Sequence, residues 1–199
     1  MPIVLPRRIP VTRFDSDATD GTPGWPIAAW THSVYEELEP LGTMATMADP
    51  ESGDLTVELE ITDDRLADDE VPIEQTIRTR RNPHGDLAVL TLRTDEGTRS
   101  FLVEIGAFGI RGRHPLVEFG ANGEILNSWP EAVVFHGSND GSPAVHRFEI
   151  RVPEVSADTI RGIQMELADN DRSYHTQWRR LAPRGAMLEF PASTPNPSP

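Results

Sequence analysis

The sequence contains no cysteine, and this absence removes several classes of function. Without cysteine the chain cannot form disulfides, zinc–sulfur sites or a thiolate nucleophile. No apolar run approaches the length of about 20 residues that a membrane-spanning helix needs. The N-terminus also lacks the apolar stretch of a secretory signal peptide. We therefore expect a cytoplasmic protein, or a module excised from a secreted one, with no membrane partner.

Lysine is absent too, so all 18 basic residues are arginine, against 32 acidic residues. The net charge of −14 argues against nucleic acid as a partner, because the phosphate backbone attracts positive charge. Catalytic signatures are missing as well: there is no Gly-x-Ser-x-Gly, no His-Glu-x-x-His and no glycine-rich phosphate loop. The sequence gives no motif-level sign of an enzyme.

What the chain has in abundance is short segments in which apolar and polar residues alternate. Leu55–Ile61 is the clearest, because every second residue is apolar, as in a half-buried strand. Two hairpins are indicated by Gly97 and by the Asn122-Gly123 turn. Further strands are predicted at Val71–Thr79, Leu87–Leu92, Phe101–Ile105, Leu116–Phe119, Glu124–Leu126, Phe148–Val152 and Ile163–Leu167. Strands at this spacing predict an all-β fold, an antiparallel two-sheet sandwich of jelly-roll type, with a lipocalin-like β-barrel as the alternative.

The chain length of 199 residues fits one domain with a substantial core. We assign residues 1–190 to a single β-sandwich domain. The last segment, residues 191–199, reads PASTPNPSP and is too rich in proline and serine to join a core. It is expected to be a disordered tail or a linker.

The region before Trp178 is the most informative part of the sequence. Its first strand reaches Pro153, which cannot donate to a β-ladder and so marks a strand end or an edge. Ser156 is predicted to cap a short helical turn. A second strand then leads into the segment Asp169–Trp178, which is acidic and aromatic. A polar, aromatic loop on a β-scaffold is typical of recognition.

The order of these pieces resembles the family 9 carbohydrate-binding modules and their DOMON-like relatives, which are β-sandwiches. The resemblance rests on Asp20-Gly21 before a tryptophan, on LEITDD ending at Asp64, and on EFGANGEIL. It continues in EIRVP, SADTIRG and DNDRSYHTQW, and covers roughly residues 18–180. The chain departs from the family pattern between Thr98 and His114.

The resemblance implies a non-catalytic module that binds an oligosaccharide or polysaccharide. An aromatic ring stacks on the apolar face of a sugar, while polar groups contact its hydroxyls. Trp178 matches the family's sugar-stacking tryptophan, and Trp25, Trp30 and Trp129 are candidates for a second stacking face. The candidate ligand-binding residues are Trp178, Asp169, Asn170, Asp171, Arg172, Gln177, Trp129 and Trp25.

The resemblance also implies calcium as a cofactor. Calcium prefers six or more oxygen ligands from carboxylates, amides and carbonyls. Oxygen-rich stretches occur around Asp63-Asp64, Asp140 and Asp169, although none has the spacing of an EF-hand. Our candidate metal ligands are Asp63, Asp64 and Asp140.

Two other classes of function stay open. A small lipocalin-like barrel can catalyse a cyclisation or isomerisation with a shaped apolar pocket and one acid, for which Glu104 and Tyr35 are candidates. Such an enzyme would leave no motif. The third possibility is a structural or assembly β-domain. The interior distinguishes the binding module from the barrel enzyme, because the enzyme needs an apolar cavity and a binding module has a filled core.

Overall fold

A computed structural model describes residues 25–29, 38–49, 51–63, 77, 85–105, 113–139, 141, 143–169, 177–181 and 186–190. For residues 25–29, 38–42, 63, 113–114, 169 and 177–179 it describes only the backbone. The expected tail, residues 191–199, lies outside the described residues. Among the described residues no helix is long and apolar enough to cross a membrane.

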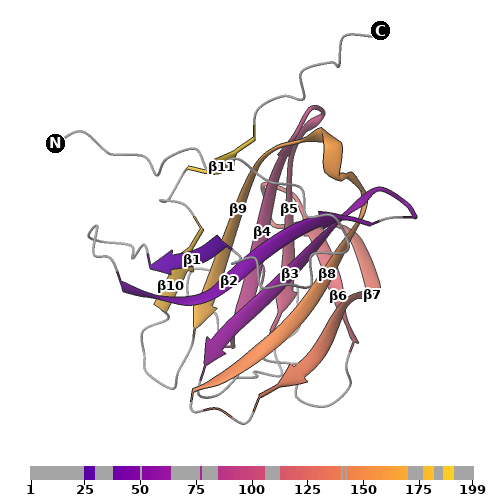
Figure 1. The fold of residues 1–199 in the computed structure, drawn as a ribbon. Helices are drawn as coiled ribbons and strands as arrows, with labels where there is room; N and C mark the ends of the chain where they lie inside the picture. Colours follow the sequence, from indigo (N-terminus) through magenta and orange to yellow (C-terminus); the bar gives the residue numbers. More distant parts are fainter. Residues whose placement is uncertain are drawn as a thin grey trace, which may run out of the picture.

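The described chain is almost entirely β-strand, which confirms the all-β, antiparallel fold class (Figure 1). All strands belong to one hydrogen-bonded sheet in the order β1-β2-β3-β8-β7-β6-β5-β4-β9-β10, with β11 pairing to β9. The strands are β1 Trp25–Ala29, β2 Leu38–Ala48, β3 Asp54–Asp63, β4 Leu87–Thr94, β5 Gly97–Glu104, β6 Arg113–Phe119, β7 Ile125–Ser138, β8 Ala144–Ser156, β9 Ile160–Asp169, β10 Gln177–Arg180 and β11 Leu188–Glu189.

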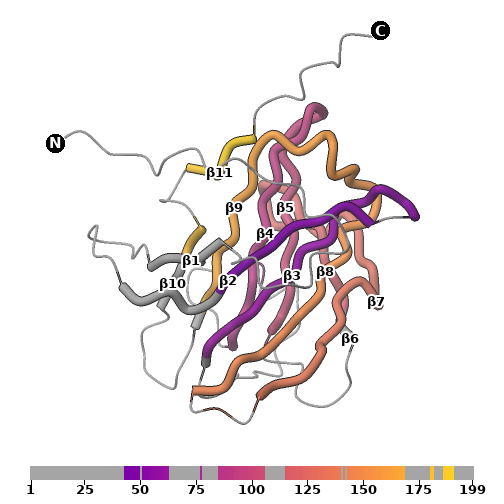
Figure 2. Tube along the Cα trace, viewed as in Figure 1, coloured from indigo at the N-terminus to yellow at the C-terminus, as the bar shows by residue number. Residues whose placement is uncertain are grey.

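The sheet curls strongly into a half-barrel, so its two walls face each other without being two separate sheets. In Figure 1, β2, β3 and β8 cross in front of β9, β4 and β5, and β1 approaches β10. Figure 2 follows β3 and β8 side by side along the front wall, where they pair over nearly their full length. The continuous curl is closer to the barrel alternative than to a sandwich of two independent sheets.

One large apolar cluster fills the inside of the curl and explains why the sheet bends. Alternate residues of β3, the clearest strand of the sequence, all point into it and are at most 2% exposed. The same alternation continues around the sheet. The inner cluster includes Leu55, Val57, Leu59, Ile61, Leu90, Leu92, Phe101, Val103, Leu116, Val133, Phe148, Ile150, Val152, Ile163, Met165 and Leu167. Burying this set removes far more apolar surface from water than a flat sheet could.

A second, smaller cluster lies on the outer face of β4, β5 and β6. It consists of Ile77, Leu87, Val89, Leu102, Val117, Phe119 and Ala168. Ile77 is the described residue that covers it from outside the sheet. It also approaches the β6–β7 turn, because a Cβ built on Gly123 would lie 3.5 Å from Ile77 Cγ2. β4 is therefore buried on both faces at its start.

Most local predictions hold, and three need correction. The hairpin through Asp95-Glu96 joins Thr94 to Gly97, and Gly123, with a φ of 81°, lies in the β6–β7 turn. The strand predicted at Val71–Thr79 is wrong at Ile77, whose backbone is helical; the remainder lies outside the described residues.

The other two corrections concern the end of β8. Of the two alternatives predicted for Pro153, the strand end is wrong. Pro153 lies inside β8, in a stretch that pairs with neither β3 nor β7 among the described residues. The short turn after it exists as a 3-10 turn, Ala157–Thr159, but the Ser156 side chain makes no capping hydrogen bond. Instead the Thr159 hydroxyl donates to the Ser156 carbonyl, at 2.8 Å.

Candidate functional site

The predicted recognition segment runs from the last residue of β9 into β10, so it includes the connection of the β9–β10 hairpin. The backbone register pairs Asp169 with Gln177 and Ala168 with Trp178. Below them Arg180, which is 3% exposed, forms an ion pair with its register partner Glu166. Asn170, Asp171 and Arg172 fall in the connection and lie outside the described residues. The hairpin thus brings both ends of the predicted segment to one place, two register positions from the Arg180–Glu166 ion pair.

Two of the three other candidate tryptophans lie on different strands, and Trp30 lies outside the described residues. The backbone pairs Trp25 of β1 with Met44, which belongs to the inner cluster. Trp129 of β7 packs partly buried against the same cluster, with its ring centroid 6.1 Å from that of Phe101. The ring of Trp129 therefore contributes to packing inside the curl. In the sheet, β6, β5, β4 and β9 separate its strand from β10, whereas β1 approaches β10.

Of the predicted calcium residues, the structure describes only the backbone of Asp63. Asp63 ends β3 and pairs with Ala144, next to the β7–β8 connection that contains Asp140. Asp64 and Asp140 themselves lie outside the described residues. Asn139, in the same connection, uses its side-chain oxygen to accept backbone N–H groups of Gly141, at 3.1 Å, and Val145, at 2.8 Å. This amide oxygen stabilises the turn.

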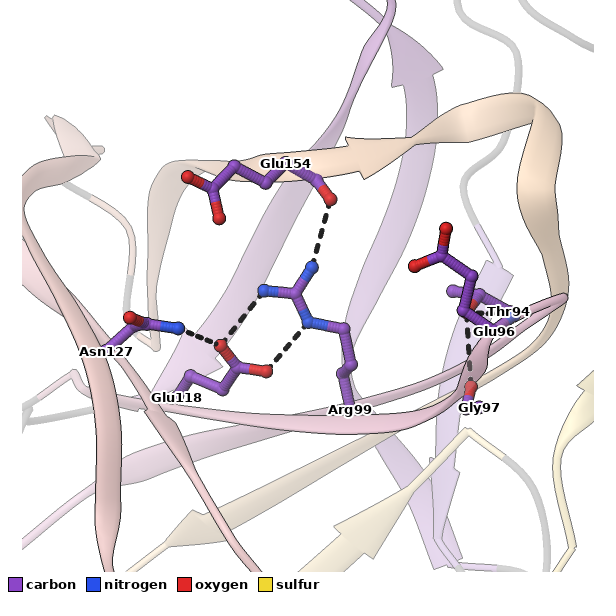
Figure 3. Close-up of polar contacts among 7 residues, drawn as sticks. All are labelled: Thr94, Glu96, Gly97, Arg99, Glu118, Asn127 and Glu154. Atoms are coloured by element: carbon purple, nitrogen blue, oxygen red, sulfur yellow. Dashed lines mark hydrogen bonds and ion pairs between the residues drawn. The ribbon is translucent and has the colours of Figure 1, made fainter.

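A polar cluster that the sequence reading missed lies on the inner face at the opposite end of β5, β6 and β7 (Figure 3). The Arg99 guanidinium donates from Nε to Glu118 Oε1, at 2.7 Å, and from Nη2 to Oε2, at 2.9 Å. Asn127 Nδ2 donates to the same Oε2, at 2.8 Å. Arg99 Nη1 donates to the Glu154 carbonyl, at 3.0 Å. The Arg99 side chain thus spans from β5 to β8.

The electrostatics of this cluster fix both charges. Hydrogen bonds from Arg99, and a further one from Asn127, lower the pKa of Glu118 against the opposing effect of burial. The hydrogen bonds with Glu118 raise the pKa of Arg99. The Glu118 side chain is 7% exposed, and the Arg99 guanidinium also lies 5.2 Å from the Phe101 ring centroid. Glu118 remains a carboxylate at neutral pH and is not suited to act as a general acid.

The backbone at Glu154 is strained where it meets Arg99. Its φ is 62°, in the left-handed region that residues with a Cβ rarely adopt. The residue follows Pro153 and lies in the interruption of the β3–β8 ladder. A conformation of this kind costs on the order of 1–3 kcal/mol and persists only where neighbouring contacts enforce it. The hydrogen bond from Arg99 to the Glu154 carbonyl is such a contact.

A weak sequence signal for this cluster existed. Arg99 stands two residues before Phe101, and Glu118 two residues after Leu116, so each occupies an inward position of an apolar strand. Opposite charges at inward positions of two paired strands predict a buried pair once the pairing is known. The β5–β6 register, which was not predicted, supplies that pairing.

Comparison with known proteins does not assign this chain to a family. Neither the protein-family models, nor the curated proteins, nor the solved structures contain a match to this chain.

Proposed function

We propose that the chain is a non-catalytic glycan-binding protein and that the loop end of the β9–β10 hairpin makes the main contact. The observation that carries this proposal is the register that places Asp169 opposite Gln177, with Trp178 next to it. Carboxylate, amide, guanidinium and indole groups then belong to one hairpin end. Sugar recognition requires this combination, because hydroxyls need polar partners and the pyranose face needs an aromatic ring.

The packed interior favours binding at an edge over chemistry in a pocket. Side chains of the inner cluster from every wall of the curl are buried at 7% exposure or less, which is the packing of a filled core. Glu104, the acid considered for a barrel enzyme, lies between Val103 and Ile105, which both point inward. Its side chain therefore belongs to the opposite face. Tyr35 lies outside the described residues.

Calcium is proposed as a structural cofactor near Asp63, Asp64 and Asp140. Support comes from the pairing of Asp63 with Ala144, and from the hydrogen bond between the Asn139 N–H and the Val145 carbonyl, at 3.1 Å. Together they place the end of β3 beside the β7–β8 connection. Carboxylates from two chain segments would then surround one cation, as calcium prefers.

The glycan proposal is tested by tryptophan fluorescence titration against a panel of soluble oligosaccharides, with and without calcium. We expect a saturable change in the wild type that is lost in Trp178→Ala and in Asp171→Ala. Trp129→Phe is the matched control, because it removes a tryptophan that packs against the core and should keep the binding response. Circular dichroism confirms that each variant is folded. A flat response of the folded wild type across the whole panel would refute glycan binding.

Trp178→Ala can itself weaken the fold, since Trp178 pairs with the buried Ala168. Asp171→Ala avoids this ambiguity because Asp171 belongs to the connection. If both variants stay folded and bind as tightly as the wild type, the contact surface lies elsewhere.

A further inference from the structure

Among the described residues, the first half of β7 has one hydrogen-bonding edge without a partner. Residues Ile125–Trp129 pair with β6 on one side. On the other side β8 pairs with β7 only from Val133 onward. Along Ile125–Pro130 the structure therefore has an open strand edge within its described residues. An open edge is a template for pairing with another strand, and proteins usually cover or block it.

The opening coincides with an irregularity in β8. Val152 pairs with Leu55 and Ser156 with Asp54, so the three residues between them have no partner in β3. This interruption contains Pro153 and the strained Glu154, whose carbonyl is held by Arg99. The Arg99 cluster thus ties this part of β8 to β5 in the stretch where β8 does not pair with β7.

The open edge begins with two exposed apolar residues and lies next to an acid. Ile125 is 38% exposed and Leu126 is 53% exposed, and these are the exposed large apolar side chains among the described residues. Glu124, just before them, is also exposed. A strand that fits here would be extended, apolar and positively charged.

The N-terminal segment of the chain has the apolar and positively charged composition that such a strand needs. Residues 1–14, MPIVLPRRIPVTRF, contain three arginines and no acidic residue, in a chain whose net charge is −14. Proline recurs every fourth residue, at Pro2, Pro6 and Pro10. In an extended strand the backbone N–H and C=O groups of successive residues alternate between its two edges. All three prolines then fall on one edge, and the other edge keeps every N–H group.

The residues whose N–H groups point to this complete edge are odd-numbered and mostly apolar. They are Ile3, Leu5, Arg7, Ile9 and Val11. Such a sequence can pair along one side and cannot accept a further strand on the other, which is how an edge strand avoids aggregation.

The chain is long enough, and leaves the sheet in the right direction, for this segment to reach the open edge. Trp25 pairs with Met44 and Ala29 with Leu38, so the chain before Trp25 leaves toward the Ala48 end of β2. That end of the sheet also holds Ser156 of β8, beside the opening. Crossing from β1 to β7 takes four strand spacings of about 4.8 Å each. The 13 residues 12–24 can span about 40 Å when extended.

We propose that residues 3–11 add to the sheet as an edge strand on Ile125–Pro130 of the same chain. The arginines of the segment would lie near Glu124, and its apolar residues would cover Ile125 and Leu126. The docked segment would complete the ladder of β7 and present its proline edge to solvent.

Two single proline substitutions test the predicted hydrogen-bonding side. Leu5→Pro places a proline on the pairing edge, whereas Val4→Pro adds one to the edge that already carries prolines. We expect the amides of Ile125–Trp129 that face the opening to exchange with deuterium about tenfold faster in Leu5→Pro and in a variant lacking residues 2–14. Val4→Pro should match the wild type. Equal exchange rates in all four proteins would overturn the proposal.

The absence of cysteine allows a second, independent test. Leu126→Cys is combined in turn with Leu5→Cys, Arg7→Cys or Ile9→Cys, and disulfide formation is followed by mass spectrometry under mild oxidation. We expect a disulfide within one chain in at least one pair. A disulfide that links two chains would overturn docking within the same chain and assign the edge to a second copy. No disulfide in any pair would overturn the docking itself.

Discussion

The outer face of the curled sheet divides into two halves with opposite character. Over β4, β5 and β6 it is apolar, and Leu102 and Val117 are buried there at 1% exposure or less. Over β3 and β8 it is charged, with Glu60 facing Arg147 and Glu58 facing Glu149. Both halves follow the same two-residue period. The outward residues, not the position in the curl, decide whether a further layer covers the sheet.

The two halves also differ in how much each contact contributes to stability. Burial of a large apolar side chain contributes roughly 1.5–3 kcal/mol, whereas an exposed ion pair contributes up to about 1 kcal/mol. A near-continuous apolar run such as the start of β4 is typical of a strand covered on both sides. We therefore regard the second cluster as a true core and the charged half as solvated surface.

Leu102→Ala should have the largest effect and tests this view directly. Leu102 is fully buried in the second cluster, so its truncation should lower the free energy of unfolding by about 2–5 kcal/mol. Glu58→Ala on the charged half is the control and should stay within about 0.5 kcal/mol of the wild type. Urea denaturation of both variants measures the difference. Similar values for the two would abolish the distinction between the halves.

Arg99→Met should have the next largest effect, because it breaks an ion pair inside the curl. It leaves the Glu118 carboxylate 7% exposed without its main partner and releases the Glu154 carbonyl. We expect a loss of about 1–3 kcal/mol in the free energy of unfolding. The double variant Arg99→Met with Glu118→Leu should recover part of this loss. If the double variant is as unstable as the sum of its single variants, the two side chains are not coupled.

The pH dependence of this pair has a definite sign. Because the folded protein holds the pKa of Glu118 below its ordinary value, the pair stabilises the fold at pH values above the unfolded-state pKa. That contribution is lost as the pH falls through the lower, folded-state pKa. Thermal melting of Glu118→Gln should therefore differ most from the wild type near neutral pH and converge with it in acid. A constant difference across the acid range would contradict the assignment.

The sequence predicted the alternating strands better than their pairing. Leu55–Ile61 forms a strand as predicted because its alternation directly reports the burial of one face. The same pattern does not show whether the walls belong to one sheet or two. That depends on pairings such as β4 with β9, which join residues more than 60 positions apart. Local propensity carries no signal for contacts at this separation.

The candidate sites show the same limit. The Asp169–Trp178 segment is contiguous, so its position at one hairpin end could be predicted. The Arg99 cluster draws on β5, β6, β7 and β8, and no local motif marks it. Pro153 correctly predicted that a β-ladder is interrupted. It did not predict that the strand continues past it through the positive φ of Glu154.

Arg147→Ala should have the smallest effect and sharpens the comparison from the charged side. Arg147 donates to Glu60 at 2.6 Å, yet the side chains are 63% and 46% exposed. Water screens this pair and competes for its hydrogen bond, so the expected loss is below about 0.5 kcal/mol and should decrease further with added salt. Urea denaturation at low and high salt measures it. A loss comparable to that of Arg99→Met would mean that the outer charges of β3 and β8 are covered by another part of the protein, as the second cluster is.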